Sequence, residues 1–318
     1  MIALYEWNET VQQMIDWLEE HITENPTLLD MSEKIGYSPY YCSIQFHKIC
    51  NMTVKSYLAN RRLALAAISI RDTRDRMIDI AIKFGFSSQE ALTRAFRAAF
   101  GCTPAAYRKN PVPLPLLNRK VIYYPDHYRE IYKGDILTMS KTVLTEAKIR
   151  IEYIPAHKYI GIYDDTAENY CDFWKTHDCD EICGVIESMR NVAHPIVSCH
   201  TAGWNLADNK RKYFYGFGVP SDYNGIIPDG FEVREIPASY YMVFYHPTFD
   251  YLKDNDEVMR RVEKLAWNYD IEQSGISDTL LGYQDHSKKY TWNNDCPCYQ
   301  RHYPEAIGYE ILRPINIK

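Results

Sequence analysis

Residues 89–97 carry hydrogen-bonding groups at a spacing that could read the edges of DNA bases. The Arg94 guanidinium can bridge guanine O6 and N7, the Gln89 amide can pair with adenine, and the Glu90 carboxylate can accept from a cytosine amine. Thr93 and Arg97 follow at intervals of three and four residues, so a helix would place all five side chains on one face. For Glu90, a solvent-facing or intramolecular ion-pair role is an equally good interpretation. Arg94 is the strongest candidate for base contact.

A second set of residues, 39–47, repeats this arrangement with different chemistry. Tyr40, Ser43 and Ile44 occupy the corresponding helix face. They offer few strong donors and would contact thymine methyl groups and the shape of the groove. We therefore predict that the helix containing Arg94 discriminates bases more sharply than the helix containing Ile44.

The elements that position these two faces form an internal repeat. Leu28–Tyr57 recurs as Met77–Tyr107, with an offset of 49 before the turn and 50 after it. Each copy reads as a short helix, a glycine turn and a longer helix, which is the helix-turn-helix pattern. Ser38 and Ser88 are candidate N-caps of the longer helices. Helical periodicity predicts a buried stripe in each copy: Tyr41, Cys42, Phe46, Ile49 and Cys50 in the first, and Ala91, Leu92, Ala95, Phe96, Ala99 and Phe100 in the second.

Between the copies, Val54–Ile70 reads as one long helix that would fix the separation of the two reading helices. Two binding segments separated by about 34 Å could contact successive major-groove faces on one side of the duplex. Arg61 and Arg62 on this helix are candidate phosphate contacts. Ordinary surface charge is the alternative for both.

Charge is distributed unevenly along the 318 residues. The overall net charge is −6, but residues 34–109 hold 13 Lys and Arg against four Asp and Glu, a net of +9. A basic stretch confined to the repeated helices is the electrostatic footprint of a DNA-binding protein. Nine cysteines, an odd number, favour reduced thiols. Because there is no long apolar run and no signal-peptide layout, we expect a soluble, cytoplasmic, nucleoid-associated protein without a membrane partner.

Residues 8–109 resemble the DNA-binding domain of the AraC/XylS family of bacterial transcription factors. The likeness is carried by Gly36-Tyr37-Ser38, by Tyr57-Leu58-x-x-Arg61-Arg62-Leu63, by Ile80-Ala81-x-x-x-Gly85-Phe86-Ser87 and by Phe96-x-x-x-Phe100-Gly101-x-Thr103-Pro104-x-x-Tyr107-Arg108. The resemblance implies an all-α domain over residues 1–110 that inserts two helices into adjacent major grooves of promoter DNA. It also implies RNA polymerase as a partner. Ser43 and Ile44 replace positions that are often polar or basic in relatives, which weakens the case for base readout by the first unit.

Beyond Asn110 the chain changes character. Pro111, Pro113 and Pro115 mark a stiff linker, which we place at residues 111–148. A second internal repeat follows, in which residues 151–163 return as residues 233–245, each copy a strand, a Pro-Ala turn and a strand. Helical patterns at roughly residues 170–192 and 256–269, and closing strands at 213–220 and 307–314, complete two similar α+β halves in a domain spanning residues 149–318.

This domain resembles the GyrI-like effector-binding domain. The likeness rests on Ile154-Pro155-Ala156, Ile236-Pro237-Ala238 and Gly308-Tyr309-Glu310-x-x-x-Pro314, and the joined architecture is similar to Rob-type regulators. The resemblance implies a pocket in which the Glu310 carboxylate and aromatic walls bind a hydrophobic or aromatic effector, including cations. The candidate walls are Tyr163, Trp174, Trp204, Tyr245, Trp267 and Trp292. For any single tryptophan, packing in the core is the stronger alternative, and for Glu310 the alternative is a water-facing strand residue.

No other chemistry has a recognisable signature. Cysteine and histidine spacings around Cys179 and Cys296 do not match structural zinc sites, and no phosphate-binding glycine loop or catalytic triad pattern occurs. We therefore expect no cofactor, no metal and no catalytic residues. The leading hypothesis is a ligand-responsive transcription factor. Its rivals are a GyrI-like small-molecule hydrolase and a constitutive DNA-binding protein whose C-terminal domain binds other proteins.

Overall fold

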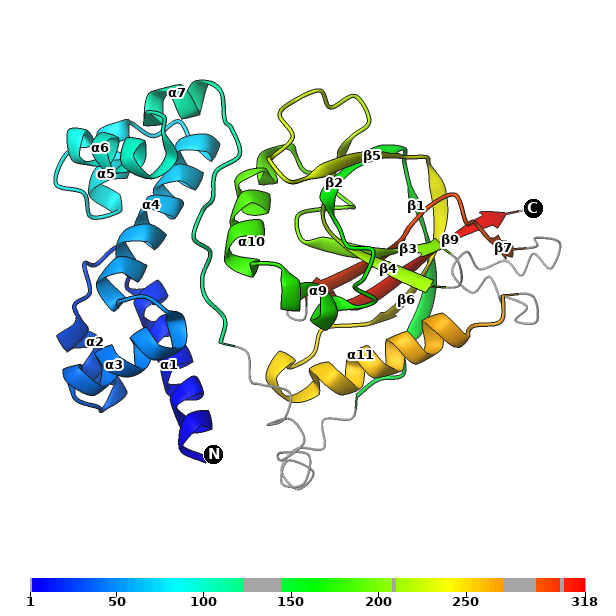
Figure 1. The fold of residues 1–318 in the computed structure, drawn as a ribbon, viewed down its shortest axis with the longest axis horizontal. Helices are drawn as coiled ribbons and strands as arrows, with labels where there is room; N and C mark the ends of the chain where they lie inside the picture. The colour runs from blue at the N-terminus through cyan, green and yellow to red at the C-terminus, as the bar shows by residue number, and fades with distance from the viewer. Residues whose placement is uncertain (1, 123–143, 208–209, 272–289, 304–305, 318) are drawn as a thin grey trace. The chain divides into compact units, whose positions relative to one another are not determined.

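The chain divides into two units in the computed structural model, which describes residues 2–122, 144–207, 210–271, 290–303 and 306–317 (Figure 1). One unit comprises residues 1–142 with 180–188, and the other comprises residues 143–179 with 189–318. The sequence placed residues 180–188 in the C-terminal domain, but their contacts group them with the N-terminal helices. Of the predicted linker, residues 123–143 lie outside the described part of the chain.

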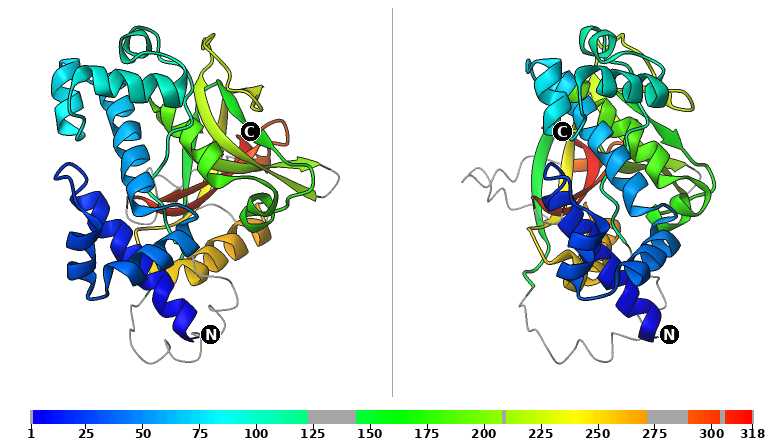
Figure 2. Two further views of the ribbon diagram at one scale, coloured as in Figure 1. Left: turned by 60° about the vertical axis from the view of Figure 1, so that its left-hand side comes forward. Right: turned by 90° about the vertical axis from the view of Figure 1, so that its left-hand side faces the viewer.

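The first unit is helical, as predicted from the internal repeat. Its helices are α1 (Ile2–Glu20), α2 (Leu28–Ile35), α3 (Pro39–Cys50), α4 (Val54–Asp72), α5 (Met77–Lys83), α6 (Gln89–Phe100), α7 (Pro104–Lys109) and most of α10 (Cys179–Ser188). The α2–α3 pair and the α5–α6 pair lie at opposite ends of α4 (Figures 1 and 2). The long spacer helix expected over 54–70 is therefore confirmed, with two further residues at its C-terminus.

Matching caps explain why both copies fold alike. Ser38 caps α3 by accepting from the Tyr41 amide, and Ser88 caps α6 by accepting from the Ala91 amide, both as predicted. The turn before each reading helix contains a glycine with positive φ, 84° at Gly36 and 76° at Gly85, which only glycine adopts without strain. The repeat in the sequence therefore reflects a repeat in backbone conformation.

Each helix-turn-helix unit has its own core, and α4 contributes to both. Cys42 and Phe46 of α3 pack in the first core, and Leu92 and Phe96 of α6 pack in the second. The predicted burial is wrong at Tyr41, which is 55% exposed, and at Ala99, which also faces solvent. Tyr41 instead stacks on Trp7 of α1, with 6.4 Å between ring centroids.

The first residues of the predicted linker do not behave as a free tether. Residues 111–122 have no regular secondary structure, yet Leu114 and Leu116 are buried in the core of the second helix-turn-helix unit. Leu117 and Ile122 pack against the core of the first. We call residues 111–122 the strap, because this segment connects the two cores along the unit.

The second unit is a sheet with helices. Its strands are β1 (Lys148–Ile154), β2 (His157–Tyr163), β3 (Thr201–Ala207), β4 (Lys210–Pro220), β5 (Glu232–Ile236), β6 (Ser239–His246), β7 (Tyr290–Trp292), β8 (Cys298–Tyr303) and β9 (Gly308–Ile317). Helices α9 (Tyr170–Thr176) and α11 (Tyr251–Asn268) also belong to it. The helical pattern predicted over 170–192 is thus broken, because His177 adopts an extended backbone between α9 and α10.

The two predicted halves are present, and they exchange strands. The sheet order is β1-β6-β9-β8-β3-β4-β2-β5, all neighbours are antiparallel, and β7 pairs with β9. Reading the order from either end gives the same succession of equivalent strands. The first strand of each half pairs with the other half, β1 with β6 and β5 with β2. Each Pro-Ala turn therefore connects two strands that do not pair with each other.

The two faces of this sheet differ. Helix α11 packs on β6 and β9, where the Glu263 carboxylate accepts from Tyr309 and the Ala266 carbonyl accepts from Arg313 (Figures 1 and 2). The opposite face carries an aromatic core that includes Tyr159, Tyr241 and Tyr299. None of the described helices has the length and apolarity needed to cross a bilayer.

Candidate DNA-binding face and candidate effector site

The second reading helix presents the predicted polar face to solvent. Gln89, Glu90, Arg94 and Arg97 on α6 are exposed, while Thr93 is half-buried and its hydroxyl donates to the Gln89 carbonyl at 2.9 Å. This leaves the Arg94 guanidinium in solvent, where it can reach a base edge. The structure therefore brings the five residues together as the spacing predicted.

Glu90 also has an intramolecular role. Hydrogen bonds to Ser88 and to its own backbone hold the pKa of the Glu90 carboxyl below its usual value, and the Arg94 charge adds to this effect. A carboxylate in the first turn also interacts favourably with the helix dipole. The ionised Glu90 thus stabilises the start of α6 whether or not it also contacts a base.

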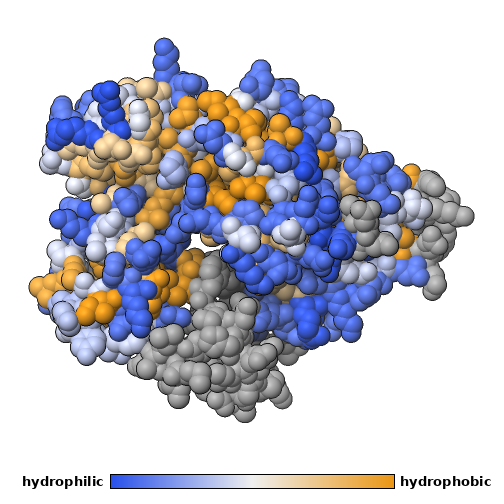
Figure 3. Space-filling model, in the orientation of Figure 1, coloured by the Kyte–Doolittle hydropathy of each residue, from blue (hydrophilic) through white to orange (hydrophobic). Residues whose placement is uncertain are grey.

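The first reading helix presents an aromatic and apolar face. Tyr40 is 72% exposed and Ile44 is 43% exposed, with Ser43 half-buried between them. Tyr37 and Tyr41, which the face prediction did not include, are exposed beside them. Figure 3 shows apolar residues reaching the surface at the α2–α3 end of the unit. Such a face suits van der Waals contact with thymine methyl groups better than hydrogen bonding.

Arg61 is not available to a phosphate, which corrects the predicted role. Its Nε and Nη2 donate to the two Glu19 oxygens at 2.8 and 2.7 Å, and its Nη1 donates to the Leu117 carbonyl at 2.7 Å. Only 9% of the Arg61 side chain and 12% of the Glu19 side chain are exposed. Tyr57 also donates to Glu19, at 2.6 Å. Arg61 therefore joins α1, α4 and the strap.

Burial alone would raise the pKa of Glu19. The hydrogen bonds from Arg61 and Tyr57, together with the Arg61 charge, outweigh burial and hold the pKa of Glu19 below its usual value. Arg61 lies four residues after Tyr57 on the buried stripe of α4, and this spacing could have revealed its role.

Arg62 is also engaged within the protein. Its Nε donates to the Ile22 carbonyl at 2.8 Å, and its guanidinium packs beside Gly85 of the second turn. Arg71 and Arg108 likewise donate to main-chain carbonyls. Part of the basic excess in residues 34–109 therefore stabilises the fold.

Lys34 and Lys83, which were not among the predicted phosphate contacts, are basic side chains with room to reach a phosphate. They lie in the last turns of α2 and α5, occupy equivalent positions in the two copies, and are exposed. In helix-turn-helix proteins the first helix crosses the DNA backbone. Lys34 and Lys83 are 49 residues apart, as are Gly36 and Gly85, so the internal repeat in the sequence could have identified the two lysines as an equivalent pair.

In the second unit, Glu310 lies in a buried cluster of charges. Its carboxylate pairs with Arg150 at 2.7 Å and with Arg301 at 2.8 Å, and both arginines also pair with Glu152. Exposure of the side chains rises from 3% at Glu310 to 10% at Arg301 and 27% at Arg150. Burial raises the pKa of Glu152, but the two arginines outweigh it and lower the value. We call these four residues the charge cluster.

Two of the predicted aromatic walls share the sheet face of Glu310. Tyr245 is the direct cross-strand partner of Glu310, and its ring lies 4.6 Å from the Arg150 guanidinium carbon. Tyr163 packs with Phe214 in the same aromatic core, and Arg234 lies 3.4 Å from its ring centre. Each tyrosine face is therefore covered by an arginine of the chain itself.

The four tryptophans do not gather around Glu310. Trp204 is opposite Tyr213 and Cys298, on the face that α11 covers, and its ring centre is 5.3 Å from that of Trp267. Arg313 stacks on both Trp267 and Trp292. Trp174 belongs to α9 and contacts Tyr215. The single pocket predicted from all six aromatics is therefore corrected, because alternate positions along a strand face opposite sides of the sheet.

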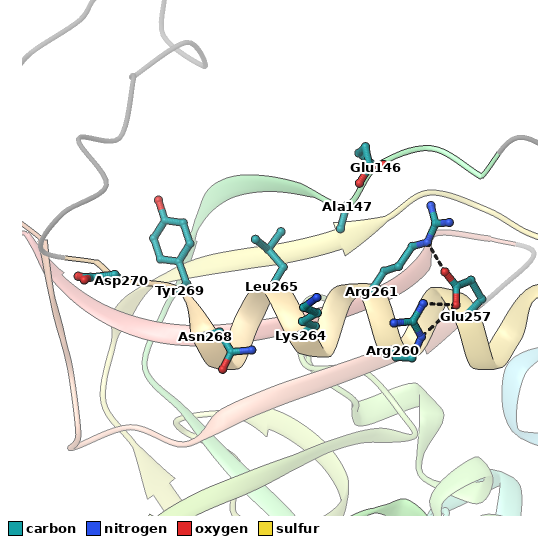
Figure 4. Close-up of a pocket in the computed structure, with 10 residues that line it drawn as sticks. All are labelled: Glu146, Ala147, Glu257, Arg260, Arg261, Lys264, Leu265, Asn268, Tyr269 and Asp270. Carbon is teal, nitrogen blue, oxygen red and sulfur yellow. Dashed lines mark hydrogen bonds and ion pairs between the residues drawn. The ribbon is translucent and has the colours of Figure 1, made fainter.

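A polar groove of about 590 Å³ runs along α11 (Figure 4). Figure 4 shows Glu257 paired with Arg260 and Arg261 at one end, and Tyr269 and Asp270 line the other end. Of the predicted ligand residues, none lines this groove. Within the described ranges, no group of His, Cys, Asp and Glu is arranged to hold a metal ion.

Similarity to known proteins is clearest in the helix-turn-helix region. A family model described as a helix-turn-helix domain matches residues 31–110. Regulatory protein SoxS of Escherichia coli (strain K12) is 37% identical over 98 residues, which make up 31% of this chain and 92% of SoxS. SoxS is a regulatory protein, and the match spans nearly its whole length.

Two solved structures show weaker likeness. The crystal structure of a transcriptional regulator with an AraC-type DNA-binding domain from Chromobacterium violaceum is 22% identical, and the match covers 33% of this chain and 96% of that one with a TM-score of 0.31. The structure of SAV2435 bound to tetraphenylphosphonium is 16% identical, and the match covers 54% of this chain and 94% of that one with a TM-score of 0.35. At such scores we draw nothing about a ligand from these likenesses.

Proposed function

The chain belongs to the AraC-type family of DNA-binding, helix-turn-helix transcriptional regulators, and on that premise we propose that α3 and α6 read successive major grooves while the second unit senses a small molecule. The main evidence for DNA recognition is the row of solvent-facing polar side chains on α6, in which the exposed Arg94 can reach a base. Helix α4 supports it, because this single helix of 19 residues carries one helix-turn-helix unit at each of its ends and so holds the two reading helices apart (Figure 1).

Division of labour between the reading helices follows from their side chains. Arg94 and Gln89 supply bidentate hydrogen bonds, which discriminate between bases by about 1–3 kcal/mol each. Tyr40 and Ile44 supply apolar contact that tolerates several sequences. We expect the promoter site to be well defined beneath α6 and rich in A·T pairs beneath α3.

Phosphate contacts are assigned to Lys34 and Lys83 in place of Arg61 and Arg62. Both lysines are exposed at the ends of the helices that precede the reading helices. Because the two heads carry equivalent lysines, each should contribute about equally to the salt dependence of binding.

Support for a sensing role of the second unit comes from the charge cluster. Burying Glu310 and Arg301 in a sheet is costly unless both charges are compensated, as they are here by each other and by the half-buried Arg150 and Glu152. Groups with a perturbed pKa, such as Glu152, cluster at functional sites. The rise in exposure from Glu310 to Arg150 gives the cluster a side that reaches solvent.

The class of effector follows from the charges around Glu310. Two arginines already neutralise this carboxylate and a third guanidinium covers Tyr163, so a cation would meet no uncompensated negative charge. We therefore assign the site to an uncharged aromatic or hydrophobic ligand. Of the ligands that the resemblance implied, this proposal keeps the uncharged ones and excludes the cations.

Two experiments test the proposal separately. Selection of duplexes from a random pool by wild-type protein and by Arg94→Ala should yield one base position that is specified only by wild type, with the first-head positions unchanged. Titration with isosteric pairs such as tert-butylbenzene and trimethylphenylammonium, followed by tryptophan fluorescence, should show saturable binding of the neutral member alone. Tighter binding of the cation would overturn the ligand class, and turnover of a ligand would favour an enzyme.

A further inference from the structure

Most of helix α10 belongs to the DNA-binding unit although the chain on both sides of it belongs to the second unit. Its first turn is tied to the strap by an ion pair between Asp180 and Lys120. At its other end the Ser188 hydroxyl accepts from the Leu114 amide at 2.9 Å. The helix therefore contacts the strap near both of its own ends.

The C-terminus of α10 also binds α4. Nη1 of Arg71 donates to the Glu187 carbonyl at 3.0 Å and to the Ser188 carbonyl at 2.7 Å. These carbonyls lie at the C-terminal end of the helix, where a guanidinium complements the helix dipole. The Arg71 side chain is 1% exposed, so this contact lies in the interior of the unit.

Between these anchors, α10 and the strap touch through their backbones at Gly184. A Cβ atom added there would lie 2.1 Å from the Leu116 carbonyl oxygen and 2.9 Å from the Leu116 nitrogen. Gly184 and Ser188 are four residues apart and share this face. Ile182 and Ile186, on the other side of α10, are also buried. Because no side chain separates the two backbones at Gly184, a displacement of α10 would act directly on the strap.

The strap is the segment on which such a displacement would matter. Leu114 and Leu116 are part of the core beneath α6, whereas Leu117 packs against the core beneath α3 and receives the Arg61 hydrogen bond. Moving the strap would therefore change the packing of both reading heads together.

We propose that the strap and Arg71 form the docking surface for α10, and that docking of α10 sets the relative orientation of the two reading heads. This inference deepens the proposed function, since the second unit would act on DNA binding through the two covalent junctions of α10. With α10 docked, binding of one head holds the other near its groove at high effective concentration. With α10 displaced, the two heads bind more nearly as separate modules.

The test uses the full chain without any effector. The probes are a two-groove duplex selected from a random pool by wild-type protein and the same duplex with the bases beneath α3 scrambled. Gly184→Ala should lose about tenfold in affinity for the two-groove duplex and less than about twofold for the scrambled one. Ser188→Ala, which leaves the Leu114 amide without its acceptor, should lose about threefold with the same selectivity. Glu181→Ala, an exposed change on the same helix, is the matched control.

Two results would overturn the proposal. If α10 were an ordinary surface helix, alanine at 184 would raise its helix propensity, and Gly184→Ala would bind both duplexes as tightly as wild type or more tightly. Equal losses on the two duplexes would show that docking serves folding alone. Faster hydrogen exchange in residues 114–120 of Gly184→Ala, with unchanged circular dichroism, should accompany the expected result. Because no effector is present, failure of the sensing proposal would leave these outcomes unchanged.

Discussion

Replacing Arg61 with alanine tests whether the basic side chains of α4 hold the fold or bind DNA. The substitution removes three hydrogen bonds, two to Glu19 and one to the Leu117 carbonyl. It leaves the Glu19 carboxylate buried, and within the described residues the Tyr57 hydroxyl is the side-chain donor that remains to it. Removing one partner of a buried pair costs about 3–5 kcal/mol, against about 0–1 kcal/mol for a surface pair. Because Tyr57 still donates to Glu19, we expect about 3 kcal/mol.

The effect should depend on pH in a defined direction. In wild type the pKa of Glu19 is depressed, so its stabilising contribution is present above the usual glutamate range and is lost as the pH falls through the folded-state pKa. In Arg61→Ala the loss of these contacts lets burial raise the pKa of Glu19, so the ionised carboxylate destabilises the variant at neutral pH and protonation removes that cost as the pH falls. The difference between the two proteins should therefore shrink in acid.

Native-state hydrogen exchange of the α4 amides measures this free energy without requiring the whole chain to unfold in one step. Under conditions in which the variant is folded, its affinity for DNA should fall with salt as steeply as that of wild type. A loss of stability below about 1 kcal/mol, together with a salt slope reduced by about one, would restore the phosphate role and refute this reasoning.

Three further predictions concern other parts of the molecule. Lys34→Ala and Lys83→Ala should each weaken binding to all duplexes about equally and reduce the salt slope by about one, and a slope unchanged in both would remove the lysines from the backbone contact. Glu310→Gln should destabilise the second unit by about 3 kcal/mol in urea unfolding, because Arg150 and Arg301 lose their most buried partner; a stable variant that only weakens a cationic ligand would contradict this account. Burial lowers the pKa of His157 to about 4, so the unfolded chain binds a proton that the folded state rejects between pH 6.5 and 4, and this histidine alone should lower stability by about 3 kcal/mol as the pH decreases through that window. The pKa of His302 is also about 4, so the two histidines together should contribute about 6 kcal/mol; His157→Asn should lose about half of that, and an undiminished slope would contradict the assignment.

The local elements of the first unit could be predicted because local rules determine them. Ser38 and Ser88 cap their helices, Gly36 and Gly85 adopt positive φ, and α4 runs as one helix. The reading face on α6 followed from helical spacing alone. Arg61 was misjudged because a buried arginine and a surface arginine look the same in sequence, and only the acidic partner 42 positions away separates them.

The second unit shows what local patterns leave out. The two Pro-Ala segments were found, but the exchange of β1 and β5 between the halves depends on pairing over long distances in sequence. The short strands β3 and β8 were not predicted. Trp204 and Glu310 fell on opposite faces of the sheet because strand register, which the sequence does not reveal, decides which residues share a side.

A hydroxyl-radical footprint of the wild-type chain on its selected duplex tests the two-headed reading of DNA most directly. The account predicts two protected stretches on one face of the helix, centred about 10 base pairs apart. In Arg94→Ala, base preference should relax in one stretch while the other keeps its protection. A single protected stretch, or two that lose preference together, would contradict the assignment of α3 and α6 to separate grooves.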